Sequence, residues 1–321
     1  MDTSLRSQAL VLVFLVLVLL SPSCYAGILK TCQFDAIYQL GDSISDTGNL
    51  IREDPLSPFG RLPYGQNFFK DATGRCSNGL LMIDFLALSA GIPFLEPYLN
   101  SDALLTRGHG VNFAVAGSTA LPVEILAENN VLAPVTNTSL SRQLDWMFSY
   151  FNGICRDQEV VGYGATRVIV PGNFPIGCLP IYLTGFQSNH SAAYDGFHCL
   201  KGLNKLAIHH NNLLKRAIKE LRNDLPNAII VYGDYYNAFL QLLRKAELLG
   251  FDTKSTQKAC CGIGGDYDYT LTRMCGAPGV PVCSDPDQYV SWDGVHLTQK
   301  AYKFMAGWLI RYIYPELQCR A

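Results

Sequence analysis

Short apolar runs bounded by glycine, aspartate or proline recur along the chain and predict buried strands. These runs are Phe34–Leu40, Val111–Ala116, Arg167–Val170 and Ala228–Tyr232. Their length and nearly continuous hydrophobic character are typical of strands in a parallel sheet that is covered on both faces.

Hydrophobic residues at helical spacing lie between and after these runs. The segments are Leu80–Ala90, Cys199–Leu221, Tyr236–Leu249 and Gln299–Ile313, and the second of them is long and amphipathic. No internal repeat interrupts the order. The alternation of strands and helices predicts an α/β fold of three layers, with helices on both faces of a parallel sheet.

The N-terminal residues have the pattern of a signal peptide. Arg6 precedes a run of twelve apolar residues from Ala9 to Leu20, and small residues follow up to Ala26. The run is too short to span a membrane, which takes about 20 apolar residues. We therefore expect cleavage after Ala26, secretion, and a chain without a membrane anchor.

Composition narrows the function classes further. The chain is 49% hydrophobic and 16% charged, which is enough apolar material for a large core. The net charge is −2 and no basic block is present, so nucleic acid is not an expected partner. The sequence does not predict an oligomeric state.

The cysteine count indicates disulfides. Eleven cysteines are present, and loss of Cys24 with the signal peptide leaves ten. A metal site is the competing interpretation, but no two cysteines have the Cys-x-x-Cys spacing of a zinc knuckle. Adjacent Cys260 and Cys261 are expected to pair with other cysteines. The sequons at Asn137 and Asn189 predict glycosylation and fit the same secretory route.

The predicted strands end in turns that could carry chemistry. Gly41-Asp42-Ser43 follows the first strand, Gly117-Ser118-Thr119 the second and Pro171-Gly172-Asn173 the third. In parallel α/β sheets, active sites form at the carboxyl ends of the strands. A serine in such a turn is exposed, and its own amide can help to bind an oxyanion. The tripeptide alone favours an ordinary turn, because Gly, Asp and Ser are common turn residues.

A base for Ser43 is found near the C-terminus. In the segment Ser291–His296, the three-residue spacing lets the carboxylate of Asp293 reach Nδ1 of His296. The alternative is a capped turn before the last helix. We interpret the other histidines as structural or solvated; these are His109, His190, His198, His209 and His210.

Taken together, these motifs resemble the GDSL esterase/lipase family, within the SGNH hydrolases, and specifically its plant members. The resemblance covers nearly the whole mature chain and is carried by the segments that begin at Tyr38, Thr73, Val111, Val170 and Lys258, and by the closing Asp-x-x-His. Ile44 replaces the usual leucine with a side chain of similar volume.

Beyond the signal peptide, which the residue pattern places at 1–26, the resemblance implies one hydrolase domain over residues 27–321 with a flavodoxin-like α/β/α fold. It implies hydrolysis of carboxylic esters by a triad of Ser43, His296 and Asp293. It also implies an oxyanion hole that includes the amides of Ser43 and Gly117, with no metal and no cofactor. The expected substrate is a small acylated metabolite or an acylated glycan, and the expected location is the apoplast or cell wall, with the vacuole as an alternative.

One block of the family pattern is absent. Between the second and third strands, family members carry another strand, which ends in a Gly-Asn-Asp element whose asparagine donates to the oxyanion. Here Cys155-Arg156-Asp157 runs almost directly into residues 161–167. Asn173 is a weaker candidate for the missing donor. The absence leaves an alternative function: a catalytically weakened or inactive secreted glycoprotein that keeps the hydrolase fold as a binding or structural protein.

Overall fold

The computed structural model describes residues 27–101, 108–131, 135–154 and 166–319. Its strands are β1 (Ile37–Gln39), β2 (Gly110–Asn112), β3 (Arg167–Pro171) and β4 (Ile229–Gly233). Its α-helices are α2 (Leu50–Glu53), α3 (Met82–Ala90), α4 (Val123–Glu128), α5 (Leu140–Ile154), α6 (Pro180–Gly185), α7 (Lys201–Asp224), α8 (Tyr235–Arg244) and α9 (Gln299–Ile313). Short 3₁₀ helices include η2 (Ile28–Cys32), η3 (Pro58–Gly60), η5 (Ile176–Cys178), η6 (Ser191–Ala193), η7 (Pro286–Gln288) and η8 (Tyr314–Leu317).

The strands form two parallel pairs. β1 pairs with β2, with Tyr38 opposite Val111, and β3 pairs with β4, with Ile169 opposite Val231. Within the described residues, no backbone ladder joins one pair to the other. The fold is therefore α/β with small parallel sheets, and each of the four predicted runs contains or overlaps a strand.

β1 and β2 are shorter than their apolar runs predict. Beyond the paired residues, the Phe113 amide still donates to the Gln39 carbonyl at 2.7 Å, and the Val115 amide donates to the Gly41 carbonyl at 3.2 Å. The segments that follow β1 and β2 thus continue side by side, but the hydrogen bonds between them are irregular. Residues 113–116 are fully buried, which explains why this part of the run is apolar although it lies outside the strand.

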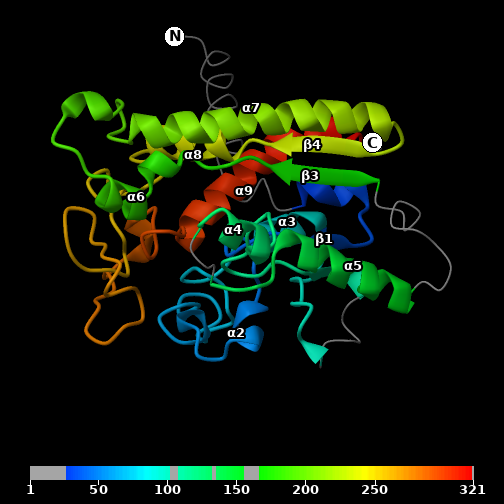
Figure 1. The fold of residues 1–321 in the computed structure, drawn as a ribbon, viewed down its shortest axis with the longest axis horizontal. Helices are drawn as coiled ribbons and strands as arrows, with labels where there is room; N and C mark the ends of the chain where they lie inside the picture. Colours follow the sequence, from blue (N-terminus) through cyan, green and yellow to red (C-terminus); the bar gives the residue numbers. More distant parts are fainter. Residues whose placement is uncertain (1–26, 102–107, 132–134, 155–165, 320–321) are drawn as a thin grey trace, which may run out of the picture.

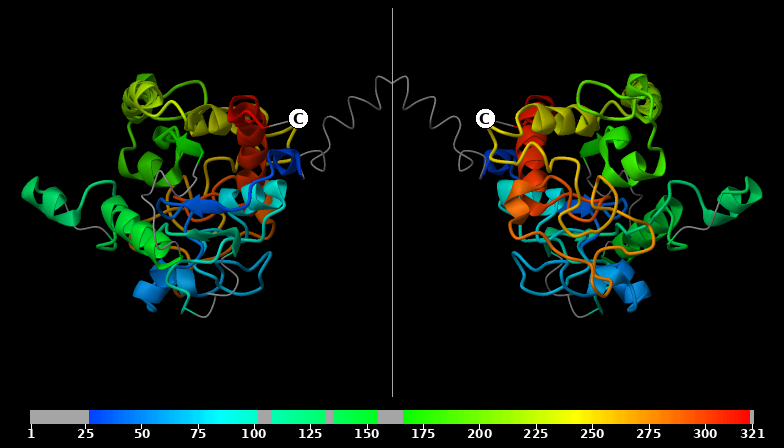
Figure 2. Two further views of the ribbon diagram at one scale, coloured as in Figure 1. Left: turned by 90° about the vertical axis from the view of Figure 1, so that its right-hand side faces the viewer. Right: turned by 90° about the vertical axis from the view of Figure 1, so that its left-hand side faces the viewer.

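Helices cover both faces of the β3–β4 pair. Ile230 and Tyr232 pack with Ile218 of α7, while Val231, between them in sequence, joins the main core with Met305 of α9. This alternation follows from the period of two along a strand. Figure 2 shows α7 and α5, which Figure 1 labels, on one side of the strands and α9 with α3 on the other.

α5 was not predicted from the hydrophobic pattern. Its aromatic residues contact the β1–β2 region: Phe151 lies edge-on to Tyr38 at 4.8 Å between ring centroids, and Tyr150 lies 5.9 Å from Phe113. Leu144 and Phe148 on the same helix are exposed. The mixture of buried and exposed apolar residues hides the helical period.

Disulfides tie the fold together as the cysteine count predicted. The described residues contain the pairs Cys32–Cys319, Cys178–Cys199, Cys260–Cys283 and Cys261–Cys275. Cys260 and Cys261 therefore pair with different partners, as expected. Cys76 is buried and unpaired, and Cys155 lies outside the described residues.

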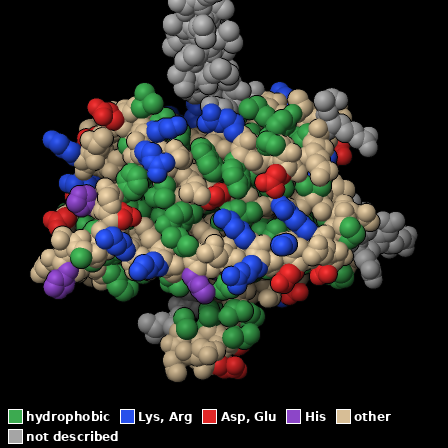
Figure 3. All heavy atoms as spheres, turned by 90° about the horizontal axis from the view of Figure 1, so that it is seen from above, with side chains coloured by type: hydrophobic (Ala, Val, Ile, Leu, Met, Phe, Trp, Pro, Cys, Tyr) green, Lys and Arg blue, Asp and Glu red, His purple; other side chains and the backbone are tan. Residues whose placement is uncertain are grey.

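The surface on the side of α7 mixes hydrophobic and basic side chains (Figure 3). Leu206, Leu213 and Leu221 of α7 are exposed there. In the part of the chain that the structure describes, no helix combines the length and the hydropathy that crossing a bilayer requires.

Candidate functional site

A continuous chain of hydrogen bonds joins the three residues that the sequence singled out. Ser43 Oγ lies 2.7 Å from His296 Nε2, and His296 Nδ1 lies 2.6 Å from Asp293 Oδ2. Asp293 and His296 are buried, whereas Ser43 is half-buried. Although Ser43 is far from His296 in the sequence, its hydroxyl lies against the imidazole, and the carboxylate lies against the other ring nitrogen. This arrangement is the one that proton transfer from a serine to an imidazole requires.

The loop that carries His296 has a fixed backbone. The Trp292 amide donates to the His296 carbonyl at 2.7 Å, which closes a tight turn over residues 293–295. Gly294 has a φ of 95°, and a Cβ there would collide with the ring of Tyr269. Glycine is therefore required at this position for both reasons.

The carboxylate of Asp293 accepts on both oxygens. The amides of Val295 and His296 donate to Oδ1 at 3.0 and 2.8 Å. Burial acts to raise the pKa of Asp293, but the charge of His296 and the hydrogen bonds from His296 and Val295 outweigh it and lower that pKa to about 2. Asp293 is thus ionised at neutral pH and can fix the orientation of the imidazole.

The loop that carries Ser43 is held by a buried carboxylate. Asp46 accepts hydrogen bonds from the amides of Gly48, Asn49 and Leu50 in its own loop, and from Ala116 beyond β2 at 2.8 Å. Burial raises the pKa of Asp46, against the lowering effect of these amides. Asp46 thus ties the Ser43 loop to the segment that leads to Gly117.

Buried amide side chains complete the attachment. The Asn49 side chain donates to the carbonyls of Asn112 and Ala114, both at 2.8 Å. The Asn112 side chain donates in return to the Ser45 carbonyl at 2.6 Å. These contacts fix the loop after β1 against the chain that leaves β2.

Gln143 of α5 bridges the two loops directly. Its Oε1 accepts from the Gly41 amide at 2.9 Å, and its Nε2 donates to the Gly41 carbonyl at 2.7 Å and to Ser118 Oγ at 2.8 Å. The side chain is fully buried. Gly41 precedes Ser43 by two residues and Ser118 follows Gly117, so Gln143 links the Gly41 backbone to the Ser118 side chain, next to both predicted oxyanion donors.

The amides of Ser43 and Gly117 donate no hydrogen bond to another described residue. Gly117 has a φ of 84°, a conformation that favours glycine. Asn173, the weaker candidate donor, has an exposed side chain, and its backbone is bound on both sides by Asn211 of α7. The segment where the family's oxyanion asparagine block is absent, residues 155–165, lies outside the described residues.

The other histidines lie apart from this chain of hydrogen bonds. His109 Nδ1 lies 3.2 Å from the Asp35 carbonyl, and the side chains of the remaining histidines are exposed; these are His190, His198, His209 and His210. Among the residues that the structure describes, no three His, Cys, Asp or Glu side chains are grouped so that they could hold a metal ion.

The sequence did not identify Asp46, Gln143 or Tyr64 as site residues. Tyr64 donates from its hydroxyl to Asp293 Oδ2 at 2.8 Å and is almost fully buried. Asp46 lies three residues after Ser43 and had a sequence signal, since Asp and Asn in turns commonly accept from nearby amides. Gln143 and Tyr64 act across long sequence separations and had none.

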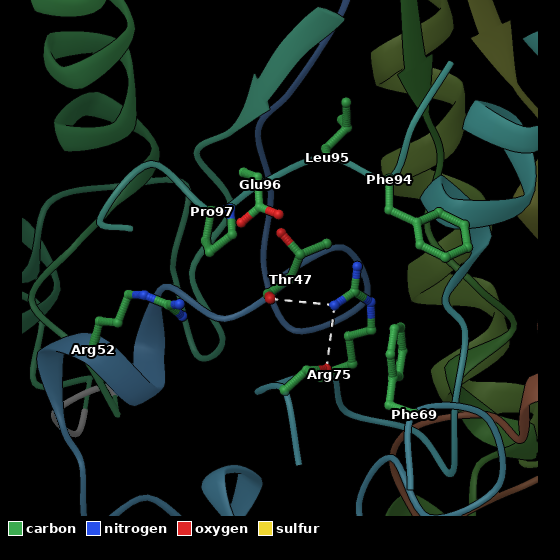
Figure 4. A pocket seen from close by; sticks show the side chains of 9 residues that line it. Thr47, Arg52, Phe69, Arg75, Phe94, Leu95, Glu96 and Pro97 are labelled. Atoms are coloured by element: carbon green, nitrogen blue, oxygen red, sulfur yellow. Dashed lines mark hydrogen bonds between the residues drawn. The ribbon is translucent and has the colours of Figure 1, made fainter. Parts of the chain in front are cut away.

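A separate hollow of about 240 Å³ is lined in part by Thr47 and Arg52, which follow Ser43 in the chain. Figure 4 shows Phe69 and Phe94 on one side of it and Arg52 on the other, with Arg75 between them. Arg75 pairs with buried Asp84 at 2.8 Å and donates to the Thr73 hydroxyl at 3.2 Å. Ser43, Asp293 and His296 do not line this hollow.

Comparison with known proteins agrees with the sequence motifs. The pattern of the GDSL-like Lipase/Acylhydrolase family matches residues 37–150 and 137–309. Acetylajmalan esterase 1 of Rauvolfia serpentina is 40% identical over 361 aligned positions, covering 95% of this chain and 94% of that protein. Acetylajmalan esterase 2 of the same plant is 40% identical, with 90% of this chain and 92% of that protein covered. A GDSL esterase/lipase of Arabidopsis thaliana is 38% identical, again covering 90% and 92%. The chain therefore belongs to the GDSL-like lipase/acylhydrolase family and is a serine ester hydrolase.

Proposed function

We propose that Ser43 is the nucleophile of this hydrolase, His296 its general base and Asp293 the residue that orients His296. The observation that carries the proposal is the uninterrupted chain of hydrogen bonds from Ser43 Oγ through the imidazole to the carboxylate. The ionised state of Asp293 supports it, because a carboxylate can stabilise the imidazolium that forms when His296 accepts a proton.

In this mechanism, His296 Nε2 takes the proton of Ser43 as Oγ attacks the ester carbonyl. The amides of Ser43 and Gly117 hold the oxyanion of the tetrahedral intermediate, which is consistent with their lack of other described partners. The protonated imidazole then gives its proton to the departing alcohol, leaving an acyl-serine. Water, activated by the same histidine, releases the acid and restores the serine.

A serine-directed fluorophosphonate probe tests this assignment. The mature protein is expected to be labelled on Ser43, and Ser43→Ala is expected to abolish the label. Labelling that survives in Ser43→Ala would identify another nucleophile and overturn the assignment. His296→Ala should slow labelling strongly, because the hydroxyl then lacks its base.

For the substrate, we propose a small acylated metabolite or an acylated glycan. The names of the Rauvolfia relatives describe esterases of acetylajmalan, which favours the first class. Acetyl release from a panel of acetylated small metabolites and from acetylated polysaccharide distinguishes the two. Turnover of polysaccharide alone would contradict the preference.

We also propose that the mature protein is secreted, extracellular and glycosylated at Asn137 and Asn189. Both asparagines are exposed, and disulfides in the described residues fit an oxidising compartment. Glycosidase treatment of the protein from plant tissue is expected to reduce its mass. Loss of the shift in Asn137→Gln and Asn189→Gln would assign the sites individually.

The finer architecture is a further part of the proposal: one three-layer flavodoxin-like sheet that lacks a central strand, which in the sequence would fall between β2 and β3. The separation of the two strand pairs supports it. So does the alignment with acetylajmalan esterase 1, since 361 aligned positions against a chain of 321 residues leave at least 40 positions of the relative opposite gaps. The family pattern is also matched in two parts, which overlap over residues 137–150.

Exposed apolar residues support the same idea. Leu144 and Phe148 on α5 and Leu206 and Leu213 on α7 are exposed, and both helices lie on one side of the strands. Val168 of β3 is 40% exposed, although strands of a covered parallel sheet are normally buried. A missing strand with its following helix would account for apolar surface at all of these positions.

These observations favour a second candidate function, namely a secreted glycoprotein with weak or no hydrolase activity. Loss of one oxyanion donor costs about 10²- to 10³-fold in rate. The test is to insert the corresponding segment of acetylajmalan esterase 1 at residues 157–161 and to compare both proteins in thermal unfolding and in p-nitrophenyl acetate hydrolysis. Equal cooperativity and equal turnover would contradict the idea of a missing catalytic block.

A further inference from the structure

Asp293 accepts more hydrogen bonds than a triad needs. Its Oδ1 takes the two loop amides of Val295 and His296. Its Oδ2 takes His296 Nδ1 at 2.6 Å and also the hydroxyl of Tyr64 at 2.8 Å. One oxygen is therefore shared between the imidazole and a tyrosine that the proposed triad does not include.

The direction of the Tyr64 hydrogen bond follows from chemistry. An ionised carboxylate can only accept, so the hydroxyl must donate. Burial raises the pKa of Tyr64 well above its usual value, and the charge of Asp293 raises it further, so the hydroxyl keeps its proton. A buried donor to a charged acceptor makes one of the stronger kinds of hydrogen bond in proteins.

Tyr64 is held in place from several sides. Phe59 lies edge-on to Tyr64, with ring centroids 5.1 Å apart, and edge-on to His296 at 5.7 Å. Trp292, next to Asp293, lies 6.3 Å from the Tyr64 ring. The Gly65 amide, next in the chain, donates to the Ser77 carbonyl at 2.9 Å. The hydroxyl is therefore fixed at the carboxylate.

We propose that Tyr64 is a positioning residue for ester hydrolysis, which holds the Asp293 carboxylate and limits the basicity of His296 by sharing Oδ2 with it. The inference rests on the proposed triad. A donor on Oδ2 withdraws negative charge from the atom that stabilises the imidazolium, so it lowers the affinity of His296 for a proton. It also leaves Asp293 a single orientation.

Other titratable side chains also lie near Asp293. Those that interact with it electrostatically, besides His296 and Tyr64, are Cys76, Tyr269 and Tyr302. In each of them burial raises the pKa, so they are uncharged at neutral pH. The charges of Asp46 and Asp42, both in the Ser43 loop, add to the effect of burial and raise the pKa of Cys76 further. None of these groups donates a hydrogen bond to the Asp293 carboxylate in the described structure.

The test compares Tyr64→Phe with Tyr269→Phe in the mature protein. Tyr269 is the matched control, because it is buried near Asp293, packs against Gly294, and its hydroxyl has no hydrogen-bond partner among the described residues. The readout is the pH profile of kcat/KM for p-nitrophenyl acetate. For Tyr64→Phe we expect the acid limb to move to higher pH by about half a unit, and kcat to fall about 3- to 10-fold with little change in KM.

Tyr269→Phe is expected to leave the acid limb in place. A purely structural role for Tyr64 would lower Tm without moving the profile, so coincident profiles for Tyr64→Phe and the unchanged protein would overturn the proposal. A site-specific 3-fluorotyrosine at position 64 keeps the ring volume and strengthens the donor. It should move the acid limb to lower pH, and it tests the proposal even if Tyr64→Phe fails to fold.

Ser43→Ala separates this inference from the function on which it rests. Activity that survives in Ser43→Ala would overturn the proposed triad, whatever the Tyr64 variants do. If Ser43→Ala is inactive but the pH profile of Tyr64→Phe does not move, the proposed triad stands and only the role of Tyr64 is overturned.

Discussion

The Ser43 loop is held by polar side chains, whereas the His296 loop is held by disulfides and aromatic rings. Asp46, Asn49 and Gln143 bind the backbone around Ser43 through buried hydrogen bonds. The segment with His296 lies instead against Cys260 and Cys261, whose amides donate to the carbonyls of Ser291 and Trp292. Both of these cysteines are cross-linked.

The two loops are held differently because they position different groups. The Ser43 loop must aim its own backbone amide at the same oxygen atom as the Gly117 amide, which follows β2, and hydrogen bonds to the backbone fix amide directions closely. The His296 loop must present one side chain, and a covalently braced cluster around Trp292 is enough to keep it there. The loops should therefore fail differently when they are perturbed.

The largest effect is expected where the loops meet. Ser43→Ala and His296→Ala should each lower kcat for p-nitrophenyl acetate by about 10⁴-fold or more, because nucleophile and base act as a unit. The double variant should be no worse than either single one. Asp293→Asn should cost less. Additive losses in the double variant would mean that the two residues act independently.

Perturbing the polar attachment should give the next largest effect. Gln143→Leu removes the bridge between Gly41 and Ser118, and displacement of the oxyanion amides by about 1 Å can cost about 10²-fold in kcat. Asn211→Leu is the matched control, since Asn211 binds the backbone of Asn173 in the same two-bond manner away from Ser43.

Both variants should lose stability, by about 1–3 kcal/mol for the unsatisfied backbone groups. Only Gln143→Leu should lose kcat strongly, measured well below Tm. Equal losses of kcat in the two variants would show that Gln143 supports the fold without aiming the amides.

Removing a disulfide behind the His296 loop should have a smaller effect on catalysis. Replacing Cys261 and Cys275 with alanine should lower kcat about 3- to 10-fold, because hydrogen bonds and packing still hold the loop. Replacing Cys32 and Cys319 should leave kcat unchanged. Each pair should cost about 2–4 kcal/mol of stability in chemical unfolding. A loss of kcat in the second pair, or none in the first, would contradict the comparison.

The smallest effect concerns stability in acid. The pKa of Asp293 is lowered to about 2 in the folded protein, so its carboxylate stabilises the fold at pH values above its ordinary pKa of about 4. That contribution, about 2 kcal/mol, is lost as the pH falls from about 4 to about 2. Urea unfolding of Asp293→Asn should show a shallower decline over this range. An identical decline would mean that other carboxylates carry it.

The sequence predicted the strands and the three hydrogen-bonded residues of the proposed triad, but it did not predict the contacts that hold these residues in place. Strand ends and the Asp-x-x-His spacing are local signals that marked Ser43, Asp293 and His296 as candidates, and the family resemblance joined them into one triad. β1 and β2 were predicted too long, since burial makes residues 113–116 apolar whether or not they form a regular ladder. The contacts of Gln143 with Gly41 and of Tyr64 with Asp293 span 102 and 229 positions, and no local pattern marks such pairs.

The Cys32–Cys319 disulfide links residues 287 positions apart. During synthesis from the N-terminus, the Cys32 thiol has to wait until Cys319 emerges, so this bond can form only on a chain that has been translated at least that far. It also encloses all the loops between those residues in one covalent circle. A protease that cuts any single loop leaves two pieces still joined, which would migrate together on a non-reducing gel and separate only after reduction.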